Sequence, residues 1–174
     1  MNTSLSPAQV LAQPFTLPNG SVVKNRIVKS AMSESLATYD NHVTPALVRL
    51  YERWADGGTG LLITGNVMID RRALGEPGNV VLEDEGDMEL LKAWARAGTV
   101  AGNQLWMQIS HAGRQSPWYV TTEPLAPSAV QLKLLANYAT PRPLREEEIL
   151  DFIQRYARVS ATARPRRAPR RAAA

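Results

Sequence analysis

Three polar side chains stand close together in one stretch of the sequence and are the first candidates for chemistry. Gln108 lies near the end of an apolar run at residues 105–109, and His111 and Arg114 follow it in a short Gly-containing turn. Ligands of parallel sheets bind outside the carboxyl ends of the strands, so side chains at these positions could reach a bound molecule. The alternative is structural: Gln108 pairs with neighbouring backbone, and His111 and Arg114 cap the next helix. Taken alone, the stretch favours the structural interpretation, and both stay open.

These side chains need buried strands to position them. The run at residues 105–109 follows Ala101-Gly102-Asn103 and breaks into small, polar residues, a pattern typical of a strand buried in a parallel sheet. A second such strand is predicted at residues 60–64, after which Gly65-Asn66 opens a long loop. A short strand is also expected at residues 27–32, which likewise end in small and polar types.

Helices are predicted between and after these strands. Thr44-Pro45 predicts a helix start, because Thr caps free backbone N–H groups and Pro suits the first helical position. This helix ends at Asp56-Gly57-Gly58, a second begins at Asp87, and a third runs from about Arg145 toward Val159. Alternating strands and helices at this spacing indicate right-handed βαβ units on a parallel sheet, so the predicted fold class is α/β.

Three further segments have no place in those units. Pro18-Asn19-Gly20 between two β-prone runs predicts a hairpin, because Asn and Gly tolerate the positive φ angles of a tight turn. Residues 1–13 show no strong pattern and are expected to form a loosely held lead-in. The Pro-rich loop at residues 116–143 is too long for a simple connection and is expected to be functional or partly disordered.

Length and composition limit the class of protein. The chain has 174 residues, of which 44% are hydrophobic and 21% charged, as in ordinary globular domains. One domain fits this length, whereas a complete (β/α)8 barrel typically needs about 250 residues. The lack of cysteine excludes disulfides and thiolate-bound zinc, and no metal site is predicted. Because no secretory signal or membrane-spanning run is evident, we expect a cytoplasmic protein with no membrane partner.

The net charge of +4 is concentrated at one end of the chain. Five of the 20 basic residues are arginines within residues 164–174, and without them the basic residues nearly balance the 16 acidic ones. This distribution argues against a nucleic-acid partner for the folded part. Residues 163–174 contain only Ala, Arg and Pro and offer no apolar face to bury. We therefore predict a folded domain at residues 1–162 and a disordered tail at residues 163–174.

Four segments carry a family resemblance when their order and spacing are considered together. They are Lys24-Asn25-Arg26-Ile27-Val28-Lys29-Ser30-Ala31-Met32, Gly60-Leu61-Leu62-Ile63-Thr64-Gly65-Asn66, Leu105-Trp106-Met107-Gln108-Ile109-Ser110-His111-Ala112-Gly113-Arg114-Gln115 and Pro141-Arg142-Pro143-Leu144-Arg145-Glu146-Glu147-Glu148-Ile149. Together with Ala126-Pro127-Ser128, they make the chain resemble the Old Yellow Enzyme family of FMN-dependent ene-reductases and NADH:flavin oxidoreductases. The resemblance covers roughly residues 14–162.

The resemblance implies the N-terminal portion of a TIM (β/α)8 barrel, with FMN at the C-terminal ends of its strands. It places Ser30, Ala31, Met32 and Ser33 in the segment after the first strand that lines the flavin. Family members often have Pro at the position of Ala31, and Thr or Cys at the position of Ser33. A hydroxyl at the latter position can hydrogen-bond a flavin carbonyl and tune its electron affinity.

Two more cofactor-binding residues are implied on the following strands. Asn66 aligns with a position beside the flavin that is usually Ala or Gly. Gln108 matches the family's glutamine, whose amide can pair with the pyrimidine edge of the flavin because that edge needs both a donor and an acceptor. The implied reaction transfers a hydride from NAD(P)H to the flavin and then to the β-carbon of an α,β-unsaturated carbonyl compound.

In this family, the remaining catalytic and phosphate-binding residues lie in the second half of the barrel and have no counterpart here. They are a His-x-x-His or His-x-x-Asn pair, a proton-donating Tyr, an Arg near the flavin and a phosphate-binding loop. The two histidines, His42 and His111, are followed three places later by Pro45 and Arg114, so neither begins such a pair. We therefore assign no catalytic residue and expect an incomplete barrel from a truncated chain. We expect this chain to bind flavin weakly and to show no turnover. Whether it is an enzyme stays open.

Two other classes of function stay open. A non-catalytic fragment could associate with another chain, or with itself, through the open edge of its sheet, because unpaired strand edges favour such contacts. A nucleic-acid-binding protein could use the Arg-rich tail, but five arginines would give only salt-sensitive, sequence-independent binding.

Overall fold

The computed structural model describes residues 5–84 and 86–163. The tail predicted at residues 163–174 lies outside the described residues except for Ala163, which is helical. The expected lead-in at residues 1–13 contains instead a one-turn helix, α1 (Pro7–Leu11). The side chain of Ser6 accepts a hydrogen bond from the Gln9 N–H, and the Gln9 side chain accepts one from the Ser6 N–H. This reciprocal capping, with Pro7 at the first position, explains why so short a segment is helical.

The predicted hairpin is confirmed. Strands β1 (Phe15–Thr16) and β2 (Val22–Val23) pair antiparallel, with Phe15 opposite Val23. Gly20 in the connecting turn has a φ of +82°, a conformation in which a side chain would be strained. The Asn-Gly pair therefore favours a turn here, because glycine adopts a positive φ without steric strain.

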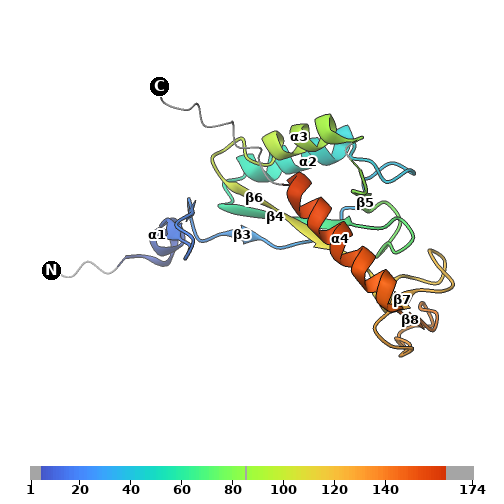
Figure 1. The fold of residues 1–174 in the computed structure, drawn as a ribbon. Helices are drawn as coiled ribbons and strands as arrows, with labels where there is room; N and C mark the ends of the chain where they lie inside the picture. Colours follow the sequence, from blue (N-terminus) through green and yellow to red (C-terminus); the bar gives the residue numbers. More distant parts are fainter. Residues whose placement is uncertain (1–4, 85, 164–174) are drawn as a thin grey trace, which may run out of the picture.

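A parallel sheet forms the centre of the molecule (Figure 1). Its strands are β3 (Val28–Lys29), β4 (Leu61–Met68), β5 (Val80–Val81) and β6 (Gln104–Ser110). Strand β4 pairs with β6 along one side, and with β3 and then β5 along the other. The parallel α/β architecture is confirmed, although β5 was not expected and β3 is shorter than predicted.

The prediction that Gly65-Asn66 opens a loop was wrong, because β4 continues to Met68. The register shows the reason: Ile63 is opposite Trp106 and Asn66 is opposite Gln108, so one extra residue is inserted into β4 between these pairs. Such a β-bulge locally disrupts the ladder and re-aims the side chains that follow it. The polar and Gly residues that suggested a loop are those of the bulge.

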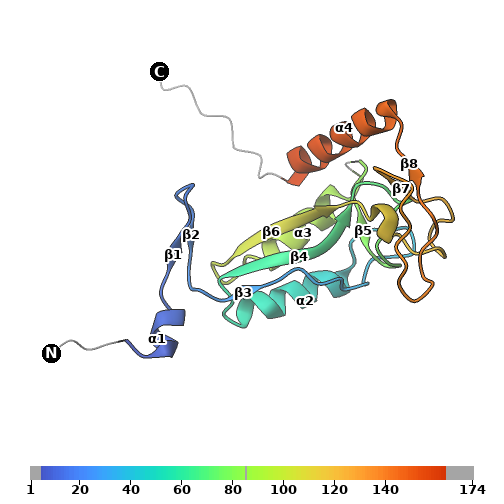
Figure 2. The same cartoon turned by 90° about the horizontal axis from the view of Figure 1, so that it is seen from below.

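Three longer helices accompany the sheet. Helix α2 (Pro45–Asp56) begins at Thr44 as predicted, α3 (Met88–Ala97) follows Asp87, and α4 (Glu146–Ala163) extends further than expected. Helices α2 and α3 lie side by side on one face of the sheet (Figure 1), and α4 packs against β6 (Figure 2). The buried core joins all three helices to the sheet, through residues that include Leu47, Tyr51, Leu62, Val67, Leu91, Trp94 and Val159.

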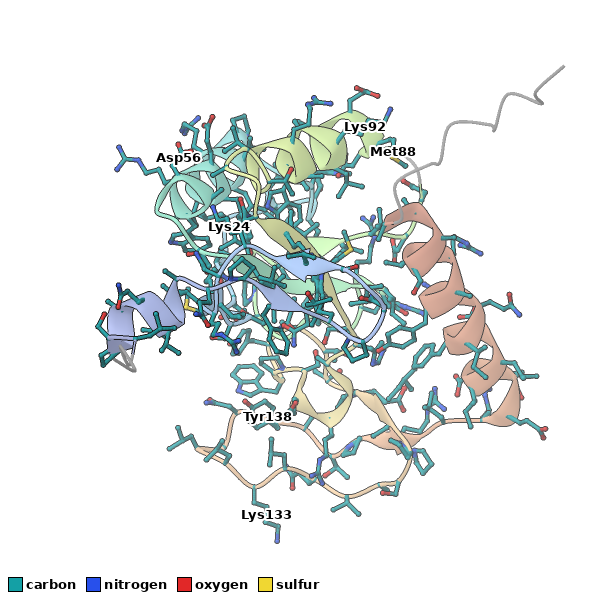
Figure 3. All side chains as sticks on the ribbon, turned by 90° about the vertical axis from the view of Figure 1, so that its left-hand side faces the viewer. Lys24, Asp56, Met88, Lys92, Lys133 and Tyr138 are labelled. Atoms are coloured by element: carbon teal, nitrogen blue, oxygen red, sulfur yellow. The ribbon has the colours of Figure 1, made fainter. Side chains whose placement is uncertain are left out.

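The other parts of the molecule are more open. In the long loop before α4, strands β7 (Leu125–Ala126) and β8 (Arg142–Pro143) form a small parallel pair. Figure 3 shows the loop that carries Lys133 and Tyr138 extending away from the sheet. Over residues 5–84 and 86–163, the strands do not close into a barrel. In the same ranges, no helix combines the length and apolar character needed to cross a lipid bilayer.

Candidate functional site

The structure brings together three of the predicted site residues, Ser33, Asn66 and Gln108. Asn66 on β4 and Gln108 on β6 are register partners across the parallel ladder, so their side chains leave the same face of the sheet. The Asn66 amide nitrogen lies 3.5 Å from the Ser33 hydroxyl oxygen, to which it donates. Residues from three separate segments of the sequence therefore form one polar row near the carboxyl ends of the strands.

This polar row lies on the face of the sheet opposite the helices. The alternate residues Leu105, Met107 and Ile109 of β6 pack against the helical core, which directs Trp106 and Gln108 to the other face. Both of these side chains are exposed. Among the described residues, the Gln108 amide has no protein hydrogen-bond partner, so the interpretation in which it only satisfies neighbouring backbone is not supported. Its donor and its acceptor are available to a ligand.

Residues 30–33, predicted to line the flavin, leave β3 and pass close over the bulge in β4. Ser30, Met32 and Ser33 are exposed, whereas Ala31 is half-buried. A Cβ atom added to Gly65 would lie 2.3 Å from the Met32 carbonyl oxygen, so only glycine permits this close approach. The segment thus borders the same open face as the polar row.

The donor set of this site fits the edge of a flavin ring. The pyrimidine edge of the isoalloxazine presents both hydrogen-bond donors and acceptors. Gln108 and Asn66 each carry an amide with both functions, and the Ser33 hydroxyl also has both. Gln108 and Ser33 are exposed and Asn66 is half-buried, so a planar group can reach this sheet face.

The other two candidates, His111 and Arg114, do not join Gln108. Arg114 is exposed on a short 3-10 helix, Gly113–Gln115, and the His111 Nδ1 accepts a hydrogen bond of 3.1 Å from the Gly113 N–H. The ring of His111 lies 4.4 Å from that of Phe152 on α4, and its burial lowers its pKa. His111 therefore has a local structural contact with the start of the following turn, but neither His111 nor Arg114 is the N-cap of the 3-10 helix, which is Ala112.

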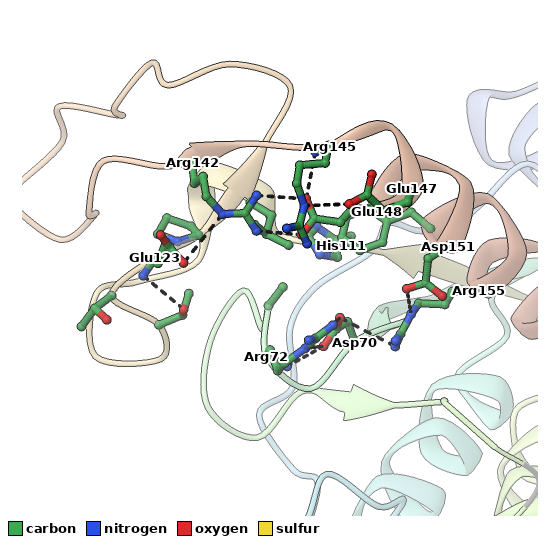
Figure 4. A pocket seen from close by; sticks show the side chains of 16 residues that line it. Asp70, Arg72, His111, Glu123, Arg142, Arg145, Glu147, Glu148, Asp151 and Arg155 are labelled. Carbon is green, nitrogen blue, oxygen red and sulfur yellow. Dashed lines mark hydrogen bonds and ion pairs between the residues drawn. The ribbon is translucent and has the colours of Figure 1, made fainter.

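His111 lines a separate cavity of about 540 Å³ between α4 and the loops at the carboxyl end of the sheet (Figure 4). Charged residues dominate its lining, but they pair with one another. Arg142 donates to Glu148 at 3.0 and 2.8 Å, which lowers the pKa of that carboxyl to about 2, and Arg155 pairs with Asp151 at 2.7 Å. The Arg142–Glu148 pair joins α4 to β8, whereas the Arg155–Asp151 pair lies within α4, so these charges have a structural role.

Asp70 extends this network to the end of β4. Its burial alone would raise its pKa, but hydrogen bonds and charge from Arg72, with the charge of Arg155, outweigh burial and hold the pKa below its usual value. Arg72 lies 2.6 Å from Asp70, and Arg155 lies 3.7 Å from it.

Sequence reasoning missed two charged residues that flank the segment at residues 30–33. Lys29 and Glu34 are both largely buried, with side-chain exposures of 11% and 8%, and their charged atoms lie 3.9 Å apart. A lysine within an otherwise apolar strand, followed five places later by a glutamate, was the available signal.

The fold and the site together define an α/β protein whose parallel strands present a polar ligand site near their carboxyl ends. The model of the NADH:flavin oxidoreductase / NADH oxidase family matches residues 10–168. The chain therefore belongs to this family, whose cofactors, FMN and NAD(P)H, are those that the resemblance implied.

Characterised relatives agree with this assignment. The NADH-dependent flavin oxidoreductase iliE of Hypocrea jecorina is 30% identical over 169 residues, a match that covers 86% of this chain and 42% of the relative. The NADH oxidase of Thermoanaerobacter brockii is 34% identical over 146 residues, covering 82% of this chain and 22% of the relative. The chain thus spans less than half the length of these relatives.

A solved structure extends the agreement to the fold. The Old Yellow Enzyme homologue of Zymomonas mobilis superimposes with a TM-score of 0.76 and 27% identity, over 88% of this chain and 45% of the other. The predicted fold class, part of an Old Yellow Enzyme type of TIM barrel that is not closed over the described residues, is confirmed.

Proposed function

We propose that this chain forms the part of an FMN-dependent NAD(P)H oxidoreductase that binds the flavin ring. The observation that carries the proposal is the placement of Asn66 beside Gln108 across the β4–β6 ladder, with Ser33 within reach of Asn66. Membership of a flavin oxidoreductase family supports the choice of ligand.

Each residue would contribute a defined interaction. Gln108 would pair with the pyrimidine edge of the flavin, since its amide can donate and accept at once. The Ser33 hydroxyl would supply a further hydrogen bond, with its orientation influenced by the Asn66 amide that donates to it. Ser30, Ala31 and Met32 would line the ring through the backbone and small or flexible side chains. When bound, FMN supplies the hydride chemistry between a reduced nicotinamide and an organic acceptor.

For the acceptor, we propose an α,β-unsaturated carbonyl compound, the class implied by the resemblance to ene-reductases. Because the chain spans less than half of its relatives, this substrate is proposed for the activity of the whole protein. None of the described side chains is assigned a catalytic role in that reaction.

Flavin binding tests the proposal directly. The purified chain is dialysed to equilibrium against FMN, which also detects weak binding, and the visible absorption of flavin on the two sides of the membrane is compared. We expect an excess of flavin on the protein side that is reduced in the Gln108→Ala variant. No excess of flavin with a folded chain would contradict the proposal.

One observation favours a second candidate function, association with another polypeptide. Among the described residues, β6 pairs only with β4, so its other edge is free, and Trp106 on its open face is 42% exposed. Free edges of parallel strands readily pair with further strands. Sedimentation of the purified chain over a range of concentrations tests this candidate, which requires a concentration-dependent oligomer.

A further inference from the structure

The buried ion pair Lys29–Glu34 holds the segment at residues 30–33 on the side that faces the helices. The Lys29 ammonium group donates to the carbonyl oxygens of Ser30 at 2.9 Å and of Ile63 at 2.8 Å. It also lies 4.5 Å from the ring centroid of Trp54 on α2, a favourable cation–π distance. Lys29 thus ties the start of the segment to both the neighbouring strand and the helix.

Glu34 fastens the other end of the segment to the bulge of β4. Its Oε1 accepts hydrogen bonds from the Gly65 N–H at 3.2 Å and from the Tyr51 hydroxyl at 2.5 Å. Tyr51 is fully buried on α2, and its hydroxyl also accepts from the Gly65 N–H at 3.1 Å. The carboxylate therefore connects the loop, the strand and the helix at one point.

Burial makes the two charges depend on each other. With 11% and 8% of their side chains exposed, Lys29 and Glu34 have lost most of their hydration. Removing one partner would leave the other charge buried and uncompensated, which is strongly unfavourable. Because the pair spans residues 29 and 34, the four residues between them are held at both ends.

We propose that Lys29 and Glu34 are positioning residues of the flavin site, which hold residues 30–33 in the place from which they line the ring. This inference rests on the proposed function, but its structural half does not require FMN. Neither side chain is expected to touch the ligand, because both face α2 and the bulge while the polar row faces the opposite side of the sheet.

Mobility of the segment tests the proposal without any ligand. The chain lacks cysteine, so a Ser33→Cys substitution provides a single site for a nitroxide spin label. We expect an immobilised spectrum when Lys29 and Glu34 are intact, and a clearly more mobile one after Lys29→Met or Glu34→Gln. The matched control is Lys92→Met, which breaks an exposed ion pair with Glu89 whose side chains are 52% and 81% exposed.

Flavin affinity supplies the second measurement, made in chains that retain Ser33. We expect the Kd for FMN to rise at least tenfold in Lys29→Met and Glu34→Gln, and to stay unchanged in Lys92→Met. Should a single variant fail to fold, the double variant Lys29→Met/Glu34→Gln removes both buried charges. We expect this double variant to fold, and to show the same increased mobility of the spin label and the same weakened binding of FMN.

The outcomes separate the two proposals. Unchanged label mobility in folded variants overturns the positioning role, whatever the flavin result. Increased mobility with an unchanged Kd also overturns it, because residues 30–33 would then not need to be held. If the unmodified chain binds no FMN, the proposed function fails, and the positioning role in that site fails with it even where mobility increases.

Discussion

The hydroxyl of Thr64 accepts a hydrogen bond of 2.9 Å from the backbone N–H of Gln108. This contact occurs at the bulge, where the extra residue in β4 interrupts the regular ladder. The same hydroxyl donates to the Gly65 carbonyl oxygen at 2.8 Å. One buried side chain therefore replaces a ladder interaction and fixes the backbone from which the Gln108 amide projects.

Removing the Thr64 hydroxyl should lower the free energy of unfolding. Thr64→Val keeps the shape but removes the hydroxyl, so the Gln108 N–H loses its partner at a cost of about 1–3 kcal/mol. Thr64→Ser keeps the hydroxyl and should lose much less. Denaturant unfolding of both variants provides the measurement; equal stabilities would show that the hydroxyl does not support the bulge.

Gly65 should tolerate no side chain. A Cβ atom there would lie 2.3 Å from both the Met32 carbonyl oxygen and the Glu34 carboxylate, so Gly65→Ala should destabilise the protein by about 1–3 kcal/mol. It should also weaken FMN binding, because the displaced segment lines the proposed site. Gly57→Ala is the matched control, since an added Cβ there meets atoms only at 3.4 Å or more. If the Gly65→Ala and Gly57→Ala variants have equal free energies of unfolding, the close approach of Met32 and Glu34 to Gly65 is contradicted.

The bulge also shows the limits of sequence reasoning. Strand and helix positions followed from apolar spacing, and the hairpin and the start of α2 followed from turn and capping chemistry. The sequence predicts a loop at Gly65-Asn66, because a bulge and a loop use the same residue types and differ only in pairing with β6. The short strand β5 was missed for a related reason, since two residues carry no periodicity.

The candidate site was predictable only in part. The family resemblance predicts Ser33, Asn66 and Gln108; the parallel register places Asn66 beside Gln108, and a hydrogen bond from Asn66 brings in Ser33. Lys29 and Glu34 escaped notice because their pairing depends on burial beneath α2, which local sequence does not show. His111 is ambiguous in the sequence because a polar residue after a strand can either face a ligand or bond the backbone of the next turn, and its Nδ1 accepts from the Gly113 N–H.

The stability of the protein should fall below neutral pH through His111. Burial lowers the pKa of His111 in the folded protein from the ordinary value of 6.5, so the unfolded chain takes up the proton first as pH decreases. The stabilising contribution of the neutral ring is present above pH 6.5 and is lost as pH falls from there through the folded pKa. Protonation at Nδ1 would also remove the acceptor for the Gly113 N–H.

Thermal unfolding at a series of pH values measures this effect. His111→Asn replaces the titratable ring with an amide that can still accept from Gly113, and it should flatten the decline in Tm below pH 6.5. Gln154→Asn changes an exposed residue on α4 that does not titrate, and should leave the decline in place. An identical decline in His111→Asn and the unmodified protein would exclude His111 as its source.

The most direct test of the central claim is a titration of the chain with FMN, followed by the change in flavin fluorescence. We predict saturable binding whose Kd rises about tenfold in Gln108→Ala, because hydrogen bonds to the ring edge are lost. Gln154→Ala, which truncates an exposed glutamine on α4, should bind FMN like the unmodified chain. Equal Kd values for Gln108→Ala and Gln154→Ala, or no saturable binding by the unmodified folded chain, would contradict the assignment of this sheet face as the flavin site.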